Sequence, residues 1–317
     1  FLLASSLGVL LFLVPFPTEG VWKIPVGIAA DGLTALLRPA LPAAAVSLAV
    51  LSAVLTLAWR LPALGRRFDG PACERLFRPT PVWLTLRVLG ALTGVLLLFQ
   101  AGPAWLHSEG VGGVVIGQLA PVILMIFLVA GLALPLLTDF GLMDFTGVLA
   151  QPLFRPLFTV PGRAAVDAVA SWMGSSPVGV LITMRQYDGG FYNAREAAII
   201  ATNFSIVSTA FCYAVASLLD VAHRFPGFYV TVTVAGIVCA VILPRIPPLS
   251  LKAETYVDGR AAAPDGSESI GAGADGPAAE GNGRSMLATA MHLATARAAA
   301  APPLAAVFRN AAVNVLD

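Results

Sequence analysis

The sequence contains little charge for its length. Of its 317 residues, 12% are charged and 57% are hydrophobic, and the mean hydropathy is +0.83. Soluble domains carry roughly 25% charged residues. Half that share cannot cover a soluble surface of this size, so much of the surface must face lipid. The composition therefore indicates an integral membrane protein, with the lipid bilayer as its surroundings.

Other scarcities exclude whole classes of function. The net charge is +1 and no block of Lys and Arg occurs, which argues against a nucleic-acid partner. The three cysteines form no CxxC pair, so we expect neither a disulfide framework nor a metal site: Cys73, Cys212 and Cys239. The chain also lacks a Walker A motif, so ATP drive within it is not expected.

Enzymatic motifs are missing as well. Residues 174–176 read Gly-x-Ser and resemble the start of an intramembrane serine protease site. That chemistry needs a histidine base within a span, and the surrounding residues do not fit GxSxG. The three histidines lie in loops or near the C-terminal region, and no HExxH occurs: His107, His223 and His292. We therefore predict that the protein is not an enzyme.

Long apolar runs predict membrane-spanning helices, each of which needs about 20 residues. Residues 1–16 have no cleavage site and are closed by Pro15 and Pro17, so they fit a clipped first span rather than a signal peptide. We expect both ends of the chain to be truncated. The fold class predicted is an all-α, polytopic membrane protein with spans at 1–16, 40–59, 82–101, 112–137, 196–219 and 226–244.

Arginines set the predicted orientation. The 60–79 segment carries five arginines against two acidic residues, whereas the 17–39 loop has only Lys23 and Arg38. The positive-inside rule then places 60–79 in the cytoplasm. The later arginines can also be cytoplasmic if residues 140–185 enter and leave the membrane from the same side, which predicts a re-entrant segment.

The middle of the chain begins at the end of the fourth predicted span. Thr138 and Asp139 are suited to capping the helix that follows, and a gating or ligand role is the alternative for Asp139. The apolar stretch 142–158 contains Pro152 and Pro156, which we expect to interrupt it.

The next helical run, 163–185, carries a polar face. Its members are spaced by three, four and eight residues: Asp167, Ser171, Gly174 and Ser175. Arg163 precedes Asp167 by four residues and is suited to pair with it, either as a structural ion pair or as part of a solute site.

A backbone break is predicted inside this run, at residues 174–177. Ser176 is a good N-cap and Pro177 suits the first position of a new helix. A break at membrane depth exposes unpaired backbone groups, so it must line a polar cavity or pack within protein. Transporter folds build solute sites in this way, with helix N-termini pointing at the ligand.

The following helix, 196–219, has two polar sides. Glu196 and Asn203 lie seven apart on one face. Thr202, Ser205, Ser208, Thr209 and Cys212 gather on nearly the opposite face. Polar residues in spans are often functional, although Ser and Thr also bond their own helix carbonyls and Glu196 also fits an interfacial charge. The predicted substrate-binding set is Asp167, Ser171, Gly174, Ser175, Ser176 and Asn203, with Thr138, Asp139, Pro177, Arg163 and Glu196 in gating or capping roles.

Five stretches of the chain together form a recognisable pattern. They read LLTDFGLM (136–143), PLFRPLF (152–158), SWMGSS (171–176), AREAAIIATNFS (194–205) and ILPRIPP (242–248). These stretches resemble the nucleoside-recognition Gate domain, and most closely its YjiH-type bacterial membrane proteins. Concentrative nucleoside transporters, ferrous-iron permeases and spore maturation proteins share this domain. The resemblance implies a multi-pass protein of the bacterial inner membrane that takes part in solute movement.

We divide the chain accordingly. Residues 1–137 form the N-terminal spans and 138–248 the Gate domain with interrupted helices. Residues 249–285, rich in Ala, Gly, Asp and Glu, read as a disordered cytoplasmic linker. A short helix over 285–300, ended by Pro302 and Pro303, opens a C-terminal membrane region over 286–317.

The leading functional hypothesis is a permease for a small polar solute, nucleoside-like as the first guess. It needs no cofactor, although coupling to H⁺ or Na⁺ fits the site, with Asp167 as the proton-carrying group. The alternative is a non-transporting membrane scaffold, sensor or assembly protein. A homodimer is the starting hypothesis for the oligomeric state.

Overall fold

The computed structural model describes residues 1–18, 21–59, 80–173, 176–204, 219–261 and 285–303, together with residues 212, 213, 215, 216, 306, 307 and 311. This part of the chain is almost entirely helical, which confirms the predicted fold class. The chain forms two compact units. One comprises Phe1–Ile28 and Val129–Ala312, and the other comprises Ala29–Leu128 and Val313–Asp317.

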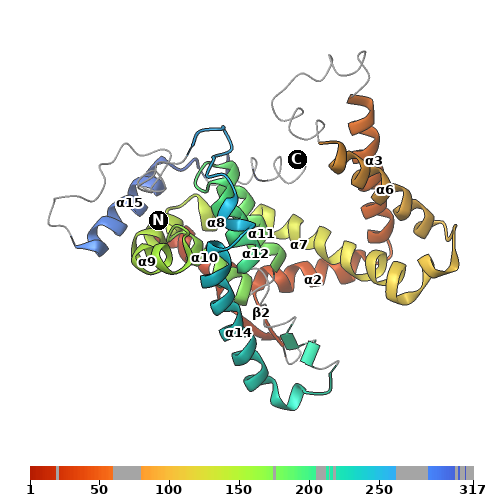
Figure 1. The fold of residues 1–317 in the computed structure, drawn as a ribbon, viewed down its shortest axis with the longest axis horizontal. Helices are drawn as coiled ribbons and strands as arrows, with labels where there is room; N and C mark the ends of the chain where they lie inside the picture. Colours follow the sequence, from red (N-terminus) through yellow and green to blue (C-terminus); the bar gives the residue numbers. More distant parts are fainter. Residues whose placement is uncertain are drawn as a thin grey trace. The chain divides into compact units, whose positions relative to one another are not determined.

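The smaller unit is built on two long apolar helices, α3 (Leu41–Trp59) and α6 (Pro81–Leu98). They lie side by side (Figure 1), with Gly94 of α6 facing the side chain of Val46. The Arg87 guanidinium donates to the Thr56 hydroxyl across this helix pair, at 2.9 Å. A 3-10 turn, η1 (Ala104–His107), and two π-helical turns, η2 (Glu109–Gly113) and η3 (Val115–Leu119), lead into α7 (Ala120–Ala133).

Four helices among the described residues are long and apolar enough to cross a membrane: Leu41–Trp59, Pro81–Leu98, Glu109–Ala133 and Phe225–Leu251. They match four of the six predicted spans. The first predicted span contains α1 (Leu2–Leu13), a shorter apolar helix of 12 residues. Only the start of the predicted 196–219 span is described continuously, and residues 205–211 lie outside the described part.

The prediction that residues 17–39 form a loop is wrong, because most of this segment has regular secondary structure. Strands β1 (Phe16–Thr18) and β2 (Val21–Lys23) form an antiparallel hairpin, and α2 (Pro25–Leu37) follows. Pro25 fits the first helical position because its fixed φ suits a helix and its missing N–H needs no partner there. Ile24, Val26 and Ala30 are almost fully buried, so packing stabilises this short helix.

The larger unit contains the middle of the chain, folded as short helices. They are α8 (Pro135–Thr138), α9 (Leu142–Phe158), α10 (Ala164–Met173), α11 (Ser176–Asp188) and α12 (Ala194–Asn203). The longest has 17 residues, fewer than the about 20 that a single span needs. The prediction of interrupted helices here is therefore confirmed for the described residues.

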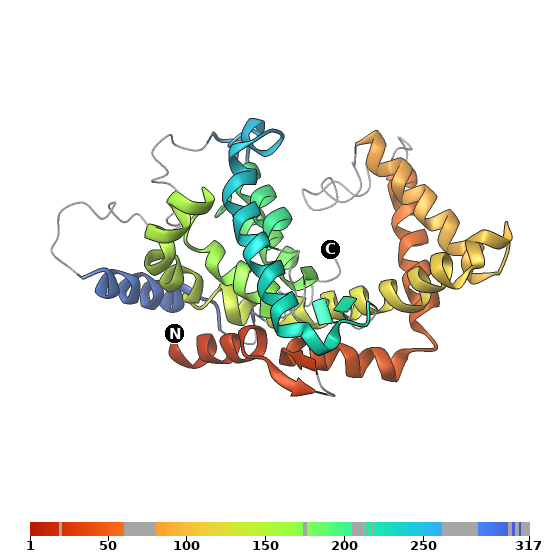
Figure 2. The ribbon, with the colours of Figure 1, turned by 60° about the horizontal axis from the view of Figure 1, so that its bottom comes forward.

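The remaining elements of this unit follow the middle segment. They are η4 (Ala222–Arg224), α14 (Phe225–Ile242), η5 (Leu243–Arg245), η6 (Leu249–Leu251) and α15 (Met286–Ala300). Helix α14 packs against α12 and α9, and it stands beside the α11–α12 region in both ribbon views (Figures 1 and 2). The short helix predicted at 285–300 is confirmed as α15, whose first backbone N–H groups include one bonded to the Ser285 hydroxyl.

Helix α9 departs from the predictions at both ends. It continues through Pro152 and Pro156 rather than being interrupted by them. It starts after Gly141, whose φ is +89°, and no side chain caps it. Thr138 and Asp139 are therefore not its caps; instead the Thr138 hydroxyl donates to the Asp139 carboxylate at 2.7 Å. Gly141 is required because a side chain there would overlap the Ala294 carbonyl of α15, which packs along α9.

An arginine satisfies carbonyls at the end of α9. The last carbonyls of a helix have no N–H partner within the helix. The Arg245 guanidinium donates to the carbonyls of Pro156, at 2.6 Å, and Leu157, at 2.8 Å. This contact ties the residues after α14 to the end of α9.

Aromatic rings join α9, α10 and α12 into one core. The Phe158 and Phe204 rings meet edge to face, with centroids 5.2 Å apart. Phe154 packs 5.1 Å from Phe158, and Trp172 lies 6.2 Å from Phe204. This core holds the ends of three short helices together, so it positions the polar residues beside it.

The beginning of the predicted disordered linker has definite structure. The Ala194 N–H donates to the Thr255 carbonyl at 2.7 Å, and Arg195 forms an ion pair with Glu254. Hydrogen bonds from the Arg260 backbone and side chain hold the pKa of the Asp258 carboxyl below its usual value. Residues 253–261 thus form a short turn attached to α12, whereas 262–284 lie outside the described residues.

Candidate functional site

Asp167 is the centre of the candidate site. Its side chain is fully buried on α10. The Thr183 hydroxyl of α11 donates to one carboxylate oxygen at 3.1 Å, and the Tyr192 hydroxyl donates to the other. Two segments, α11 and the turn before α12, therefore hold the carboxylate of α10 by hydroxyl groups.

Ser171 lies one turn after Asp167 on the same face of α10, as the spacing predicts, and it is also buried. This face packs against α11. At Gly179 of α11, an added Cβ would overlap the Ser171 hydroxyl, so the two helices approach each other closely at this point. The absence of a side chain at Gly179 is what permits this contact.

The predicted break, 174–177, falls where the description of α10 stops and that of α11 starts. Helix α10 ends at Met173 and α11 begins at Ser176. Gly174 and Ser175, two of the predicted binding residues, lie outside the described residues. Ser176 and Pro177 belong to the first turn of α11 as described, and because the residue before them lies outside the described part, their predicted capping roles stay predictions.

Arg163 does not pair with Asp167, which corrects that prediction. Its guanidinium bonds Asp144 of α9 at 2.6 Å, and both side chains are largely buried. The reason is the close approach of the chain to α9, where an added Cβ at Gly147 would lie 2.8 Å from the Arg163 side chain. Asp167 already accepts hydrogen bonds from two hydroxyl groups, and Arg163 pairs with Asp144 instead.

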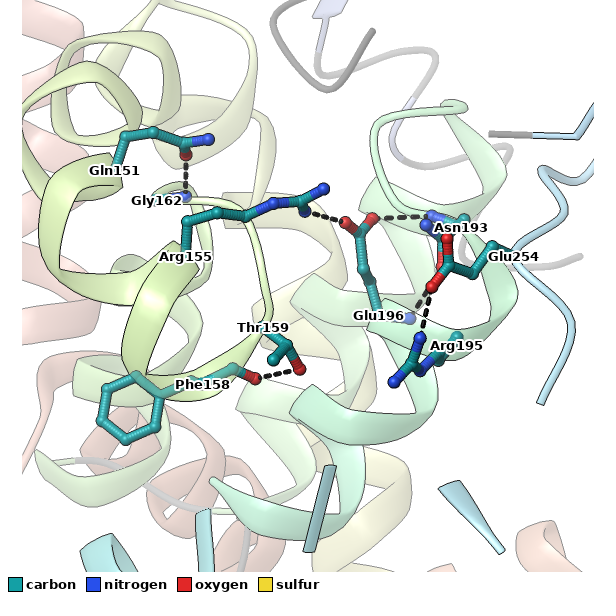
Figure 3. A network of polar contacts seen from close by, with 9 residues as sticks. All are labelled: Gln151, Arg155, Phe158, Thr159, Gly162, Asn193, Arg195, Glu196 and Glu254. Carbon is teal, nitrogen blue, oxygen red and sulfur yellow. Dashed lines mark hydrogen bonds and ion pairs between the residues drawn. The ribbon is translucent and has the colours of Figure 1, made fainter. Parts of the chain in front are cut away.

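Glu196 belongs to a capping network rather than to the protein exterior. Its side chain is 5% exposed. It accepts from the Asn193 backbone at 3.1 Å and from Arg155 at 2.8 Å, while the Asn193 side chain accepts from the Glu196 backbone at 2.9 Å. Figure 3 shows this capping box with Arg155 reaching it from α9. The predicted capping role therefore fits, and the interfacial charge does not.

Asn203, at the end of α12, is buried, and neither atom of its amide has a hydrogen-bond partner among the described residues. The Gln186 side-chain oxygen of α11 is also buried without a hydrogen-bond partner among the described residues. Leaving a buried amide unpaired costs about 1–3 kcal/mol. Such groups point to a ligand or to contacts that another state of the protein supplies.

Comparison with known proteins identifies this region. The family model for the Gate domain, described as nucleoside recognition, matches residues 120–222. Residues 120–222 are a Gate domain. The family prediction is thereby confirmed, with boundaries that start and end earlier than the predicted 138–248. Its YjiH-type subdivision stays a prediction.

A relative and the solved structures add limited information. The chain is 47% identical over 259 residues to an uncharacterized protein of Alkalihalophilus pseudofirmus, which covers 82% of the chain and 56% of that relative. The chain therefore spans little more than half the length of this relative. No solved structure matches the chain.

The Gate domain contains polar residues that the sequence did not single out. Thr183 and Tyr192 are the partners of Asp167, and Asp144 is the partner of Arg163. The position of Thr183, four residues after Gly179 in the same helix, could have placed it on the face toward α10. Tyr192 lies in a turn, and Asp144 belongs to another helix, so no periodicity connects them to the site.

The buried polar groups of the Gate domain are suited to hydrogen bonding with a ligand. A carboxylate, hydroxyls and unpaired amides can bind the hydroxyl and amide groups of a polar solute. Within the described part of the chain, no group of three or more His, Cys, Asp or Glu gathers as metal ligands. Asp167 has no ion-pair partner among the described residues, and burial of such a group without a cation is costly.

Proposed function

We propose that this protein is a permease-like protein of the bacterial inner membrane whose Gate domain binds a small polar solute, nucleoside-like as the first candidate. The observation that carries the proposal is Asp167, a fully buried carboxylate that accepts hydrogen bonds from the Thr183 and Tyr192 hydroxyls and forms no ion pair among the described residues. Ionisable groups buried in membrane proteins mark solute and ion pathways by default. The description of the Gate domain as nucleoside recognition supports the choice of solute.

The geometry suggests how solute and proton are linked. A solute that donates a hydrogen bond favours an ionised Asp167, whereas the empty site favours its neutral form, because an unpaired buried charge is costly. Thr183 and Tyr192 can rotate their hydroxyls to serve either form. Binding is therefore expected to be coupled to H⁺, with Na⁺ as the alternative ion. On neighbouring helices, the Asn203 amide and the Gln186 side-chain oxygen have no hydrogen-bond partner within the described part of the chain.

A thermal-shift screen of the full-length protein in detergent tests solute binding. We expect a nucleoside, among nucleosides, bases, amino acids and cations, to raise the apparent unfolding temperature, because a ligand bound only to the native state stabilises it by mass action. Asp167→Asn and Asn203→Leu should weaken the response about tenfold or more in ligand concentration. Asp258→Asn, at an exposed turn, is the matched control and should respond like the wild type.

If a ligand stabilises Asp167→Asn as well as it does the wild type, the binding site lies elsewhere. If no solute stabilises the wild type while the protein remains folded, the solute-binding proposal fails and a scaffold or sensor role is favoured.

Transport itself requires a site that is reached from both sides of the membrane in turn. In a background without the three native cysteines, Ser176→Cys should react with a membrane-impermeant thiol reagent from either side, and the bound solute should slow the reaction. Leu153→Cys, on an exposed part of α9 that does not contact Asp167, is the control, and solute should leave its labelling unchanged. Labelling of Ser176→Cys from one side under every condition would exclude alternating access there.

A further inference from the structure

Two arginines from distant parts of the chain meet at one aromatic ring. The Arg163 guanidinium, just before α10, lies over the Phe191 ring at 4.0 Å from its centroid. The Arg297 guanidinium, in the last turn of α15, lies over the same ring at 5.0 Å. Helix α15 is held in this position by its packing along α9, which Figure 1 shows beside it.

The two arginines at this ring have one ion-paired carboxylate between them. Asp144 is the ion-pair partner of Arg163, and the buried Asp167 carboxyl also interacts electrostatically with Arg163. Arg297 has no acidic partner among the described residues, and its charge opposes that of Arg163. The end of α15 provides a partial negative charge for Arg297, but no carboxylate among the described residues pairs with it.

The buried arginine also has unused donors. The Arg163 side chain is 4% exposed, and its Nε and Nη2 groups have no hydrogen-bond partner among the described residues. Leaving a buried charged donor without an acceptor costs more free energy than leaving a neutral donor unpaired. Arg163 can therefore donate at least one further charge-assisted hydrogen bond.

We propose that a phosphate-bearing anion binds at Phe191 between Arg163 and Arg297. Guanidinium groups present several N–H donors in a planar fork that matches phosphate oxygens, and two such groups can hold one phosphate. The anion would give Arg297 a negatively charged partner and would accept hydrogen bonds from the unused donors of Arg163. It would also tie α15 to the Gate domain.

Two sources can deliver this chemistry, a lipid headgroup and a dissolved phosphate. The two helices α9 and α15 also carry exposed apolar side chains along their length: Leu149, Leu153 and Leu157 on α9, and Met286, Leu287 and Met291 on α15. Such surfaces suit the acyl chains of a phospholipid. The experiment therefore includes one arm for each source.

The full-length protein in detergent is titrated with inorganic phosphate, against chloride at equal ionic strength, and separately with phosphatidylglycerol, against phosphatidylcholine. The apparent unfolding temperature reports binding, and native mass spectrometry counts the retained lipid. We expect saturable stabilisation by one source. Arg297→Gln should weaken it about tenfold, the effect of losing one charge-assisted hydrogen bond. Arg224→Gln, at an exposed arginine away from Phe191, removes the same charge and should bind like the wild type.

The outcomes separate cleanly. Stabilisation by inorganic phosphate supports a dissolved anion, and stabilisation by phosphatidylglycerol alone supports a lipid headgroup. The proposal is overturned if neither source stabilises the wild type, if Arg297→Gln binds as tightly as the wild type, or if Arg224→Gln weakens binding equally. Arg163→Lys keeps the charge beside Asp144 but removes the fork, so it should also weaken binding while the helical content stays unchanged.

Discussion

Gly179→Ala should lower the free energy of unfolding by about 2 kcal/mol, although alanine is the better helix former. The new Cβ would lie 2.9 Å from the Ser171 Cβ and overlap its hydroxyl. Overpacking of this kind costs about 1–3 kcal/mol or more, which exceeds the gain of about 1 kcal/mol from helix propensity. The helices α10 and α11 must separate, and Thr183, one turn after Gly179, then moves away from Asp167. Loss of solute-induced stabilisation should accompany the lower unfolding temperature.

A second substitution tests the cause. Ser171→Gly removes both the hydroxyl and the Cβ, which leaves the Ser171 Cα at 3.4 Å from the added atom, an ordinary contact. The double variant Ser171→Gly/Gly179→Ala should therefore be more stable than Gly179→Ala alone. Gly227→Ala is the control, because nothing lies within 4 Å of its added Cβ, and it should be neutral or slightly stabilising. Equal stability of Gly179→Ala and Gly227→Ala would contradict the close approach.

Local patterns were sufficient for much of this fold. Four apolar runs gave four helices of spanning length, because lipid imposes a length and a composition that a sequence displays directly. The 3.6-residue period placed Asp167 and Ser171 on one face, and the structure buries that face against α11. The Asn193 and Glu196 side chains also follow a local rule, the capping box, although Asn193 was not recognised as its first member.

The errors arise where distant segments decide. Helical spacing allowed Arg163 to pair with Asp167. Arg163 instead pairs with Asp144, an acid 19 residues earlier, because α9 packs against this part of the chain. Pro152 and Pro156 would interrupt an isolated helix, yet Arg245 and the aromatic core stabilise the end of α9. In each case a partner far along the chain outweighs a local preference, and no alternation or period reveals it.

Removing Arg163 alone should have a still larger effect on stability. Arg163→Met would leave the Asp144 carboxylate, whose side chain is 14% exposed, without its cation. Breaking a buried pair from one side costs about 3–5 kcal/mol, because an uncompensated charge remains in a poorly solvated place. The cation–π contact with Phe191 is lost as well. Reversible denaturation of the protein in detergent, followed by tryptophan fluorescence, measures the change.

The double variant Arg163→Met/Asp144→Leu distinguishes a charge effect from a packing effect. Replacing both members of a buried pair by apolar residues of similar size is often neutral or stabilising, so the double variant should recover most of the stability that Arg163→Met loses. The exposed pair Arg260–Asp258, with side chains 62% and 46% exposed, is the control, and Arg260→Met should cost less than about 1 kcal/mol. The double variant should recover stability but not phosphate or lipid binding. It restores a buried apolar core but lacks the guanidinium that lies beside Arg297. A double variant as unstable as Arg163→Met would instead assign the loss to the packing of the arginine stem against Gly147 and Phe191.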